Sequence, residues 1–165
     1  MPILGLSNLD FISRSPEQTR RLGMRLGAIL QPGDVLALSG DLGAGKTTLV
    51  QGLAQGWGSV DAVSSPTFVL VNVYRRPDGG ILHHMDAYRI DSALEAEDLD
   101  LEAMFSIGAV IIEWAERIVD VLPSQLLWVN MKWLADEQRN LVFNPIGKRY
   151  ETLVNVLKQQ AFGGS

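Results

Sequence analysis

The sequence predicts an α/β fold, because runs typical of buried strands alternate with segments of helical periodicity. The clearest unit is the apolar run 34–39, which a glycine-rich turn joins to a helical segment over 47–57. A second apolar run, 109–113, also leads into a short helix, and an Asp-Gly turn signal predicts an antiparallel pair. At 165 residues with 47% hydrophobic content, the chain suffices for one sizeable core. We therefore expect a single domain over residues 1–165.

Composition excludes several classes of site. The chain has no cysteine, which excludes disulfides, thiolate zinc sites and cysteine nucleophiles. No apolar run approaches the roughly 18 residues that span a bilayer, and the amino terminus has no secretory pattern, so we expect a cytoplasmic protein without membrane contact. The net charge of -5 argues against a free-standing nucleic-acid binder, which needs a basic face. Any role near RNA is expected to depend on a protein partner.

An edge strand and a helix are predicted first. Residues 3–12 carry enough β-branched and aromatic side chains for one edge strand. A helix is expected to begin with Ser15 as its cap, Pro16 at its first position and Gln18 at its third. Apolar residues then recur at helical spacing until a Gln-Pro-Gly sequence at 31–33 ends the helix.

The glycine-rich turn matches Gly-x-x-x-x-Gly-Lys-Thr at every fixed position. Its glycines allow positive φ angles, so that backbone N–H groups turn inward and hold the phosphates of a nucleotide. Lys46 is expected to neutralise the β- and γ-phosphate oxygens, and Thr47 to ligate Mg²⁺; the dipole of the following helix assists. The residues predicted to bind the nucleotide are Asp41, Leu42, Gly43, Ala44, Gly45, Lys46, Thr47 and Thr48.

Residues 64–67, Ser-Ser-Pro-Thr, have two interpretations. In the first interpretation, they form an ordinary turn that enters a strand. Alternatively, they form a mobile segment in which the hydroxyl of Ser65 or Thr67 senses the γ-phosphate and its metal, as switch loops do. The sequence leaves both open.

A hairpin is predicted from residues 68–74 and 81–86. If its second strand alternates, His84 and Asp86 share a face, and Asp86 ends the strand where a carboxylate could serve a metal. His83 and His84 are adjacent, but without a cysteine or a spaced third histidine they do not predict a transition-metal site.

Glu113 ends the apolar run 109–113. Because that run is unbroken, it is a better candidate than residues 81–86 for the strand that holds Mg²⁺ through water. The alternative is that Glu113 only caps the next helix.

The remainder of the chain is less specific. Six carboxylates and no basic residue lie within 91–102, which indicates a solvated helical face or an acidic surface for a partner. Residues 126–133 and 139–143 predict a second hairpin, and 148–161 a closing helix with one apolar side.

Four blocks together resemble the TsaE (YjeE) family of bacterial ATPases: Gly-Asp-Leu-Gly-Ala-Gly-Lys-Thr-Thr at 40–48, Ser-Pro-Thr-Phe at 65–68, His-Met-Asp-Ala-Tyr-Arg at 84–89, and Glu-Trp at 113–114. The resemblance runs from about residue 15 to 123. It implies a P-loop NTPase-like fold, with a mixed, mostly parallel sheet, an antiparallel hairpin and helices on both faces. It also implies that ATP hydrolysis with Mg²⁺ supports formation of threonylcarbamoyladenosine in tRNA. The implied partners are the threonylcarbamoyltransferase subunit and its inactive paralogue, through which tRNA is reached indirectly.

Carried over by position, the resemblance implies catalytic roles for Lys46, Thr67, Asp86 and Glu113. It implies that Thr47, Asp86 and Glu113 serve the metal, without deciding how Asp86 and Glu113 divide metal binding and water positioning. Arg89 is a candidate contact for phosphate or a partner.

Two other functions fit the loop. Small-molecule P-loop kinases share this length, but they need several arginines in a lid, and only Arg75 and Arg76 form a pair in a candidate loop. A nucleotide-gated binding module would bind its partner in an ATP-dependent way without needing hydrolysis. A GTPase is disfavoured because no Asn-Lys-x-Asp motif occurs.

Overall fold

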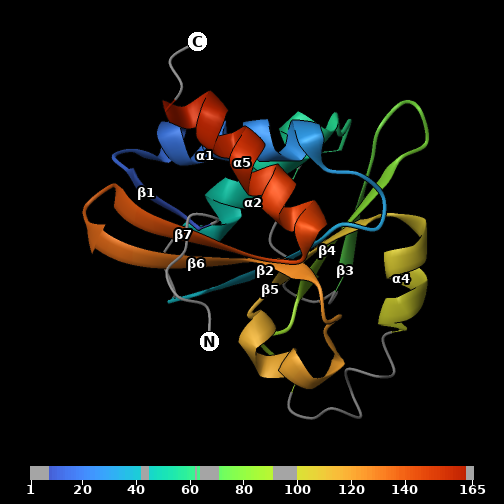
Figure 1. The fold of residues 1–165 in the computed structure, drawn as a ribbon. Helices are drawn as coiled ribbons and strands as arrows, with labels where there is room; N and C mark the ends of the chain where they lie inside the picture. The colour runs from blue at the N-terminus through green and yellow to red at the C-terminus, as the bar shows by residue number, and fades with distance from the viewer. Residues whose placement is uncertain (1–7, 42–44, 62, 64–70, 91–99, 163–165) are drawn as a thin grey trace.

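A mixed β-sheet forms the centre of the molecule. The computed structural model describes residues 8–41, 45–61, 63, 71–90 and 100–162. Within these residues, seven strands form one sheet in the order β1-β7-β6-β2-β5-β4-β3 (Figure 1). The strands are β1 (Leu9–Ser13), β2 (Val35–Gly40), β3 (Val71–Arg75), β4 (Ile81–Asp86), β5 (Ala109–Glu113), β6 (Leu126–Ala135) and β7 (Gln138–Ile146).

The middle of the sheet is parallel and its margins are antiparallel. β6, β2, β5 and β4 run parallel to one another, whereas β7, β1 and β3 pair antiparallel with their neighbours. The mixed, mostly parallel sheet and both hairpins are therefore confirmed. Parallel strands are covered on both faces, which explains the unbroken apolar runs of β2 and β5.

Helices cover both faces of the sheet, as expected (Figure 1). α1 (Pro16–Ile29), α2 (Lys46–Trp57) and α5 (Lys148–Phe162) pack on one face; α4 (Leu101–Ile107) and the 3₁₀-helix η1 (Ala115–Val121) pack on the other. The side chains of β2 alternate between the two cores: Leu36 and Leu38 face α1 and α2, and Val35 and Ala37 face α4 and η1.

The start of α1 follows the predicted capping pattern. The Ser15 side chain accepts a hydrogen bond from the N–H of Gln18 at 3.2 Å, and Pro16 occupies the first turn. The Gln18 side chain accepts from the N–H of Arg14 at 2.7 Å. β1 pairs only with β7, which confirms an edge strand within the described part of residues 3–12.

α1 and α2 approach each other backbone to backbone. A Cβ added to Gly27 would lie 2.1 Å from the carbonyl oxygen of Leu53, and one added to Gly52 would lie 2.1 Å from that of Arg20. Such distances leave no room for a methyl group, and a backbone carbonyl cannot move aside as a flexible side chain can. Close packing of α1 therefore depends on these glycines, and it sets the position of α2 behind the glycine-rich turn.

Gly27→Ala is expected to destabilise the fold by roughly 1–3 kcal/mol, because the two helices must separate to admit the methyl group. Urea unfolding followed by circular dichroism measures the loss. Ala28→Ser, at the exposed neighbouring position on α1, is the control and should leave the unfolding midpoint nearly unchanged. Equal midpoints for Gly27→Ala and the native chain would contradict the tight helix contact.

Several boundaries differ from the expectations. The short helix predicted after Trp114 is present, as a 3₁₀-helix with a non-helical residue at Ile118. The second hairpin extends further than predicted, because β6 and β7 reach Ala135 and Ile146. The closing helix is confirmed, with its apolar side buried. Most of the acidic stretch, 91–99, lies outside the described residues. None of the helices that the structure describes has the length and apolar character needed to cross a membrane.

Candidate functional site

The glycine-rich turn leaves β2 and enters α2 through two glycines in unusual conformations. Gly40 has φ 137°, and a Cβ there would lie 2.1 Å from the carbonyl oxygen of Met131 on β6. Gly45 has a left-handed φ of 93° as the N-cap of α2. A larger residue is strained at both positions. The predicted nucleotide-binding residues Leu42, Gly43 and Ala44 lie outside the described residues.

Lys46 is buried at the start of α2, with 7% of its surface exposed. Its Nζ donates hydrogen bonds to the carbonyl oxygens of Gly40 at 2.6 Å and Asp41 at 3.2 Å. The same nitrogen lies 4.0 Å from the centre of the Trp114 ring, a cation–π contact. Burial lowers the pKa of Lys46, and nearby carboxylates, Glu113 foremost, oppose that shift. The Lys46 ammonium group therefore lies against the backbone at the start of the glycine-rich turn.

Glu113 and Asp86 lie at the carboxyl ends of adjacent parallel strands. Glu113 on β5 pairs with Leu38 of β2 on one side and with Asp86 of β4 on the other. Burial raises the pKa of Asp86 and the Glu113 carboxylate raises it further, while a hydrogen bond from the N–H of Tyr88, at 2.9 Å, lowers it. The sheet register thus brings together the two carboxylates that were predicted to serve the metal.

Glu113 does not cap the following helix. The N-cap of η1 is Trp114, whose side chain makes no capping hydrogen bond. The alternative interpretation of Glu113 as a helix cap was therefore wrong.

A buried chain of hydrogen bonds reaches Glu113 from β3. Nδ1 of His84 lies 2.9 Å from the hydroxyl of Tyr74, and Nε2 of His84 bonds to Oε2 of Glu113. The His84 side chain is fully buried. Sequence reasoning placed His84 near Asp86 but missed these partners, because the pairing depends on the register of three strands. The one sequence signal for a role of His84 was its position two residues before a carboxylate that ends the strand.

Trp114 has a left-handed backbone, with φ 58°, which is strained for a bulky residue. Its ring covers Lys46 on one side and lies 5.0 Å from the ring of Tyr88. The guanidinium of Arg117 lies 5.0 Å from the centre of the Tyr88 ring in turn. These contacts fix Trp114 as one wall of the site.

The other predicted residues fall into two groups. Thr47 and Thr48 are half-buried in the first turn of α2, and Arg89 is exposed after β4. The predictions for Ser65 and Thr67 lie outside the described residues.

The β6–β7 hairpin also borders this site. A hollow of about 40 Å³ beside α2 is lined by Gly45, Thr48, Glu137 and Arg139 together with Pro16 and Thr19 of α1. Arg139 was not singled out from the sequence, because only the sheet order places the hairpin beside the turn.

The oxygen donors of the site suit Mg²⁺. No group of three or more His, Cys, Asp and Glu side chains able to hold a metal occurs within the described residues. Mg²⁺ is commonly bound by one or two carboxylates together with substrate phosphates and water, rather than by a cage of protein ligands. Thr47, Asp86 and Glu113 offer one hydroxyl and two carboxylates next to the glycine-rich turn, so the chemistry of these residues fits Mg²⁺ together with a nucleotide phosphate.

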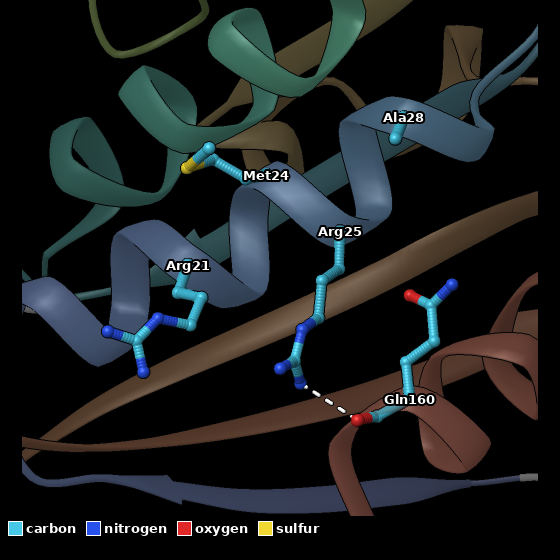
Figure 2. A pocket seen from close by; sticks show the side chains of 5 residues that line it. All are labelled: Arg21, Met24, Arg25, Ala28 and Gln160. Atoms are coloured by element: carbon cyan, nitrogen blue, oxygen red, sulfur yellow. Dashed lines mark hydrogen bonds between the residues drawn. The ribbon is translucent and has the colours of Figure 1, made fainter. Parts of the chain in front are cut away.

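A larger hollow, of about 430 Å³, lies on the outer side of α1 (Figure 2). Arg21, Met24, Arg25 and Ala28 line it from α1, and Gln160 lines it from α5. Arg25 donates a hydrogen bond to the carbonyl oxygen of Gln160 at 3.0 Å. None of the predicted site residues lines this hollow, and Arg25 there joins α1 to the end of α5.

Comparisons with known proteins agree with the four blocks. The family model described as "Threonylcarbamoyl adenosine biosynthesis protein TsaE" matches residues 13–141. The Bacillus subtilis tRNA threonylcarbamoyladenosine biosynthesis protein TsaE is 40% identical over 156 residues, which cover 93% of this chain and 96% of the relative. The protein of the same name from Streptomyces coelicolor is 43% identical over 139 residues, covering 81% and 94%. The crystal structure of Bacillus subtilis YdiB has a TM-score of 0.78 at 35% identity, covering 93% of this chain and 96% of that one.

Proposed function

Because the chain belongs to the TsaE family of threonylcarbamoyl adenosine biosynthesis proteins, we propose that it binds and hydrolyses ATP in support of that tRNA modification. Family membership gives the role in biosynthesis of threonylcarbamoyladenosine. The proposal adds the reaction: ATP and water give ADP and phosphate at the glycine-rich turn.

The proposal rests chiefly on one juxtaposition. Lys46 lies at the carboxyl end of β2, and the carboxylates Glu113 and Asp86 end the next two parallel strands. Ligands of open α/β sheets bind outside the carboxyl ends of the strands, where the helix N-terminus also favours phosphate. A cation, two carboxylates and a helix N-terminus at this edge are the parts that phosphoryl transfer needs.

Each side chain has a proposed role. Lys46 exchanges its bonds to the turn carbonyls for the β- and γ-phosphate oxygens, and backbone N–H groups of residues 41–48 hold the phosphates. Thr47, Glu113 and Asp86 serve Mg²⁺ and the attacking water, and Thr67 acts at the γ-phosphate. When bound, Mg²⁺ supplies charge that stabilises the phosphoryl oxygens. Water attacks the γ-phosphorus, the bond to the β–γ bridging oxygen breaks, and that oxygen leaves with ADP.

The proposed partners are the threonylcarbamoyltransferase subunit and its inactive paralogue. A net charge of -5 gives the chain little affinity of its own for the phosphates of tRNA. Tyr88 lies against Trp114 and Arg117 lies against Tyr88, and both side chains are exposed, so a partner that docks there would contact the wall of the site. Arg89, exposed and next to Tyr88 in the chain, is a further candidate contact.

The isolated protein is expected to hydrolyse ATP slowly and to be stimulated about tenfold or more by the two partner subunits, because catalysis of phosphoryl transfer depends on positioning. Phosphate release is measured for the protein alone, with both subunits, and with tRNA alone. Release without any acceptor favours hydrolysis over a kinase reaction. Stimulation by tRNA alone, or none by the subunits, would contradict the proposed assembly. ATP-dependent partner binding that survives complete loss of hydrolysis would favour a nucleotide-gated binding module.

A further inference from the structure

His84 is enclosed between a hydroxyl and a carboxylate. Its side chain has no exposed surface, and its two ring nitrogens are bonded to Tyr74 and Glu113. The three residues come from the adjacent strands β3, β4 and β5, so the ring bridges the antiparallel margin of the sheet and its parallel centre.

The hydrogen-bonding roles follow from the chemistry of the groups. An ionised carboxylate only accepts hydrogen bonds, so Nε2 of His84 carries the hydrogen that bonds to Oε2 of Glu113. In the neutral ring Nδ1 then accepts from the Tyr74 hydroxyl, at 2.9 Å. Both nitrogens are satisfied, and the carboxylate, as the group that can only accept, selects the tautomer. Oε2 of Glu113 is thereby occupied.

A contribution to stability alone does not explain this arrangement. The ladder between β4 and β5 already holds the two strands in register. Burying a histidine and a glutamate costs desolvation, and an apolar pair of similar volume commonly gives equal or greater stability. The polar pair is better explained by what it does to Glu113, which lies beside Asp86 at the edge of the site.

We propose that His84 is a positioning residue that holds Oε2 of Glu113 and so leaves Oε1 as the oxygen that serves Mg²⁺ or its bound water. This inference rests on the proposed function. Carboxylates that ligate metals are themselves held by hydrogen bonds in this way, and loss of such a partner costs about 10–100-fold in metal affinity or activity. Tyr74 acts one step further out, because its hydroxyl bonds to Nδ1 and holds the ring of His84.

Two variants of matched chemistry test the proposal. In His84→Gln the amide nitrogen reaches close to the position of Nε2 and can still donate to Glu113; in His84→Asn it reaches only the position of Nδ1. The readout is the gain in affinity for a fluorescent, non-hydrolysable ATP analogue when EDTA is replaced by Mg²⁺. We expect His84→Asn to lose about tenfold or more of that gain, and His84→Gln to retain most of it. Binding in EDTA should be the same in all three proteins, since the phosphate-binding turn is untouched.

Equal gains in His84→Asn, His84→Gln and the native chain would overturn the positioning role and leave His84 structural. Urea unfolding accompanies each measurement, so that affinity is compared among folded proteins. If His84→Asn does not fold, His84→Leu decides: it fills the buried position with an apolar side chain and leaves Glu113 without this donor, and a Mg²⁺-dependent gain equal to that of the native chain would overturn the proposal. A native chain that binds the analogue no better with Mg²⁺ would instead refute the proposed function itself.

Discussion

Lys46→Ala is expected to lower the rate of ATP hydrolysis by at least about 100-fold. In the structure Nζ bonds to the carbonyl oxygens of Gly40 and Asp41, so the charge lies against the turn that is proposed to hold the phosphates. Removal of a fixed charge from a site that stabilises a transition state costs far more than removal of a surface charge. Phosphate release under saturating Mg²⁺ and ATP measures the effect.

Lys46→Met separates the charge from the packing. Methionine keeps an apolar stem that can lie against Trp114, so this variant should fold as the native chain does while it loses hydrolysis as fully as the alanine variant. Lys148→Ala, at an exposed lysine that begins α5, is the control and should keep native activity. Native turnover by folded Lys46→Ala or Lys46→Met would refute the phosphate-binding role of the turn.

Alanine substitutions of the two carboxylates are expected to impair different steps, metal-dependent binding in one case and hydrolysis in the other. If Glu113 holds the metal, Glu113→Ala should lose most of the Mg²⁺-dependent gain in ATP affinity, by about tenfold or more. If Asp86 orients water, Asp86→Ala should leave binding largely intact and slow hydrolysis by about 100-fold or more. The different partners of the two carboxylates are the reason for assigning them different roles. Glu113 is hydrogen-bonded to His84, whereas Asp86 accepts a hydrogen bond from the N–H of Tyr88.

Titration of Mg²⁺-ATP against both variants, together with single-turnover hydrolysis, separates binding from chemistry. Glu151→Ala, at an exposed carboxylate on α5, is the control for loss of a negative charge. Loss of metal-dependent binding in Asp86→Ala with retention in Glu113→Ala would reverse the two roles. Native affinity and native hydrolysis in both variants would show that neither carboxylate acts in the site.

Local signals were sufficient for most of the elements. The cap of α1, the glycine-rich turn and the Asp-Gly hairpin depend on short-range backbone geometry, which a few residues determine. The 3₁₀ form of η1 was not predicted, because it begins from the left-handed Trp114 and is interrupted at Ile118. The Trp114 ring contacts Lys46 and Tyr88, which are distant in sequence, so its surroundings could not be read from the local sequence.

By itself, the sequence predicted the kind of chemistry: a glycine-rich turn ending in Lys46 and Thr47 is typical of phosphate binding through its own backbone. It also gave Asp86 and Glu113 as candidates, because each ends a strand-like run. Only the tertiary structure decided that these carboxylates are neighbours, that Trp114 covers Lys46, and that Tyr74 and His84 hold Glu113. The reason is physical: these contacts follow from strand order and register, which are set by packing of the whole sheet.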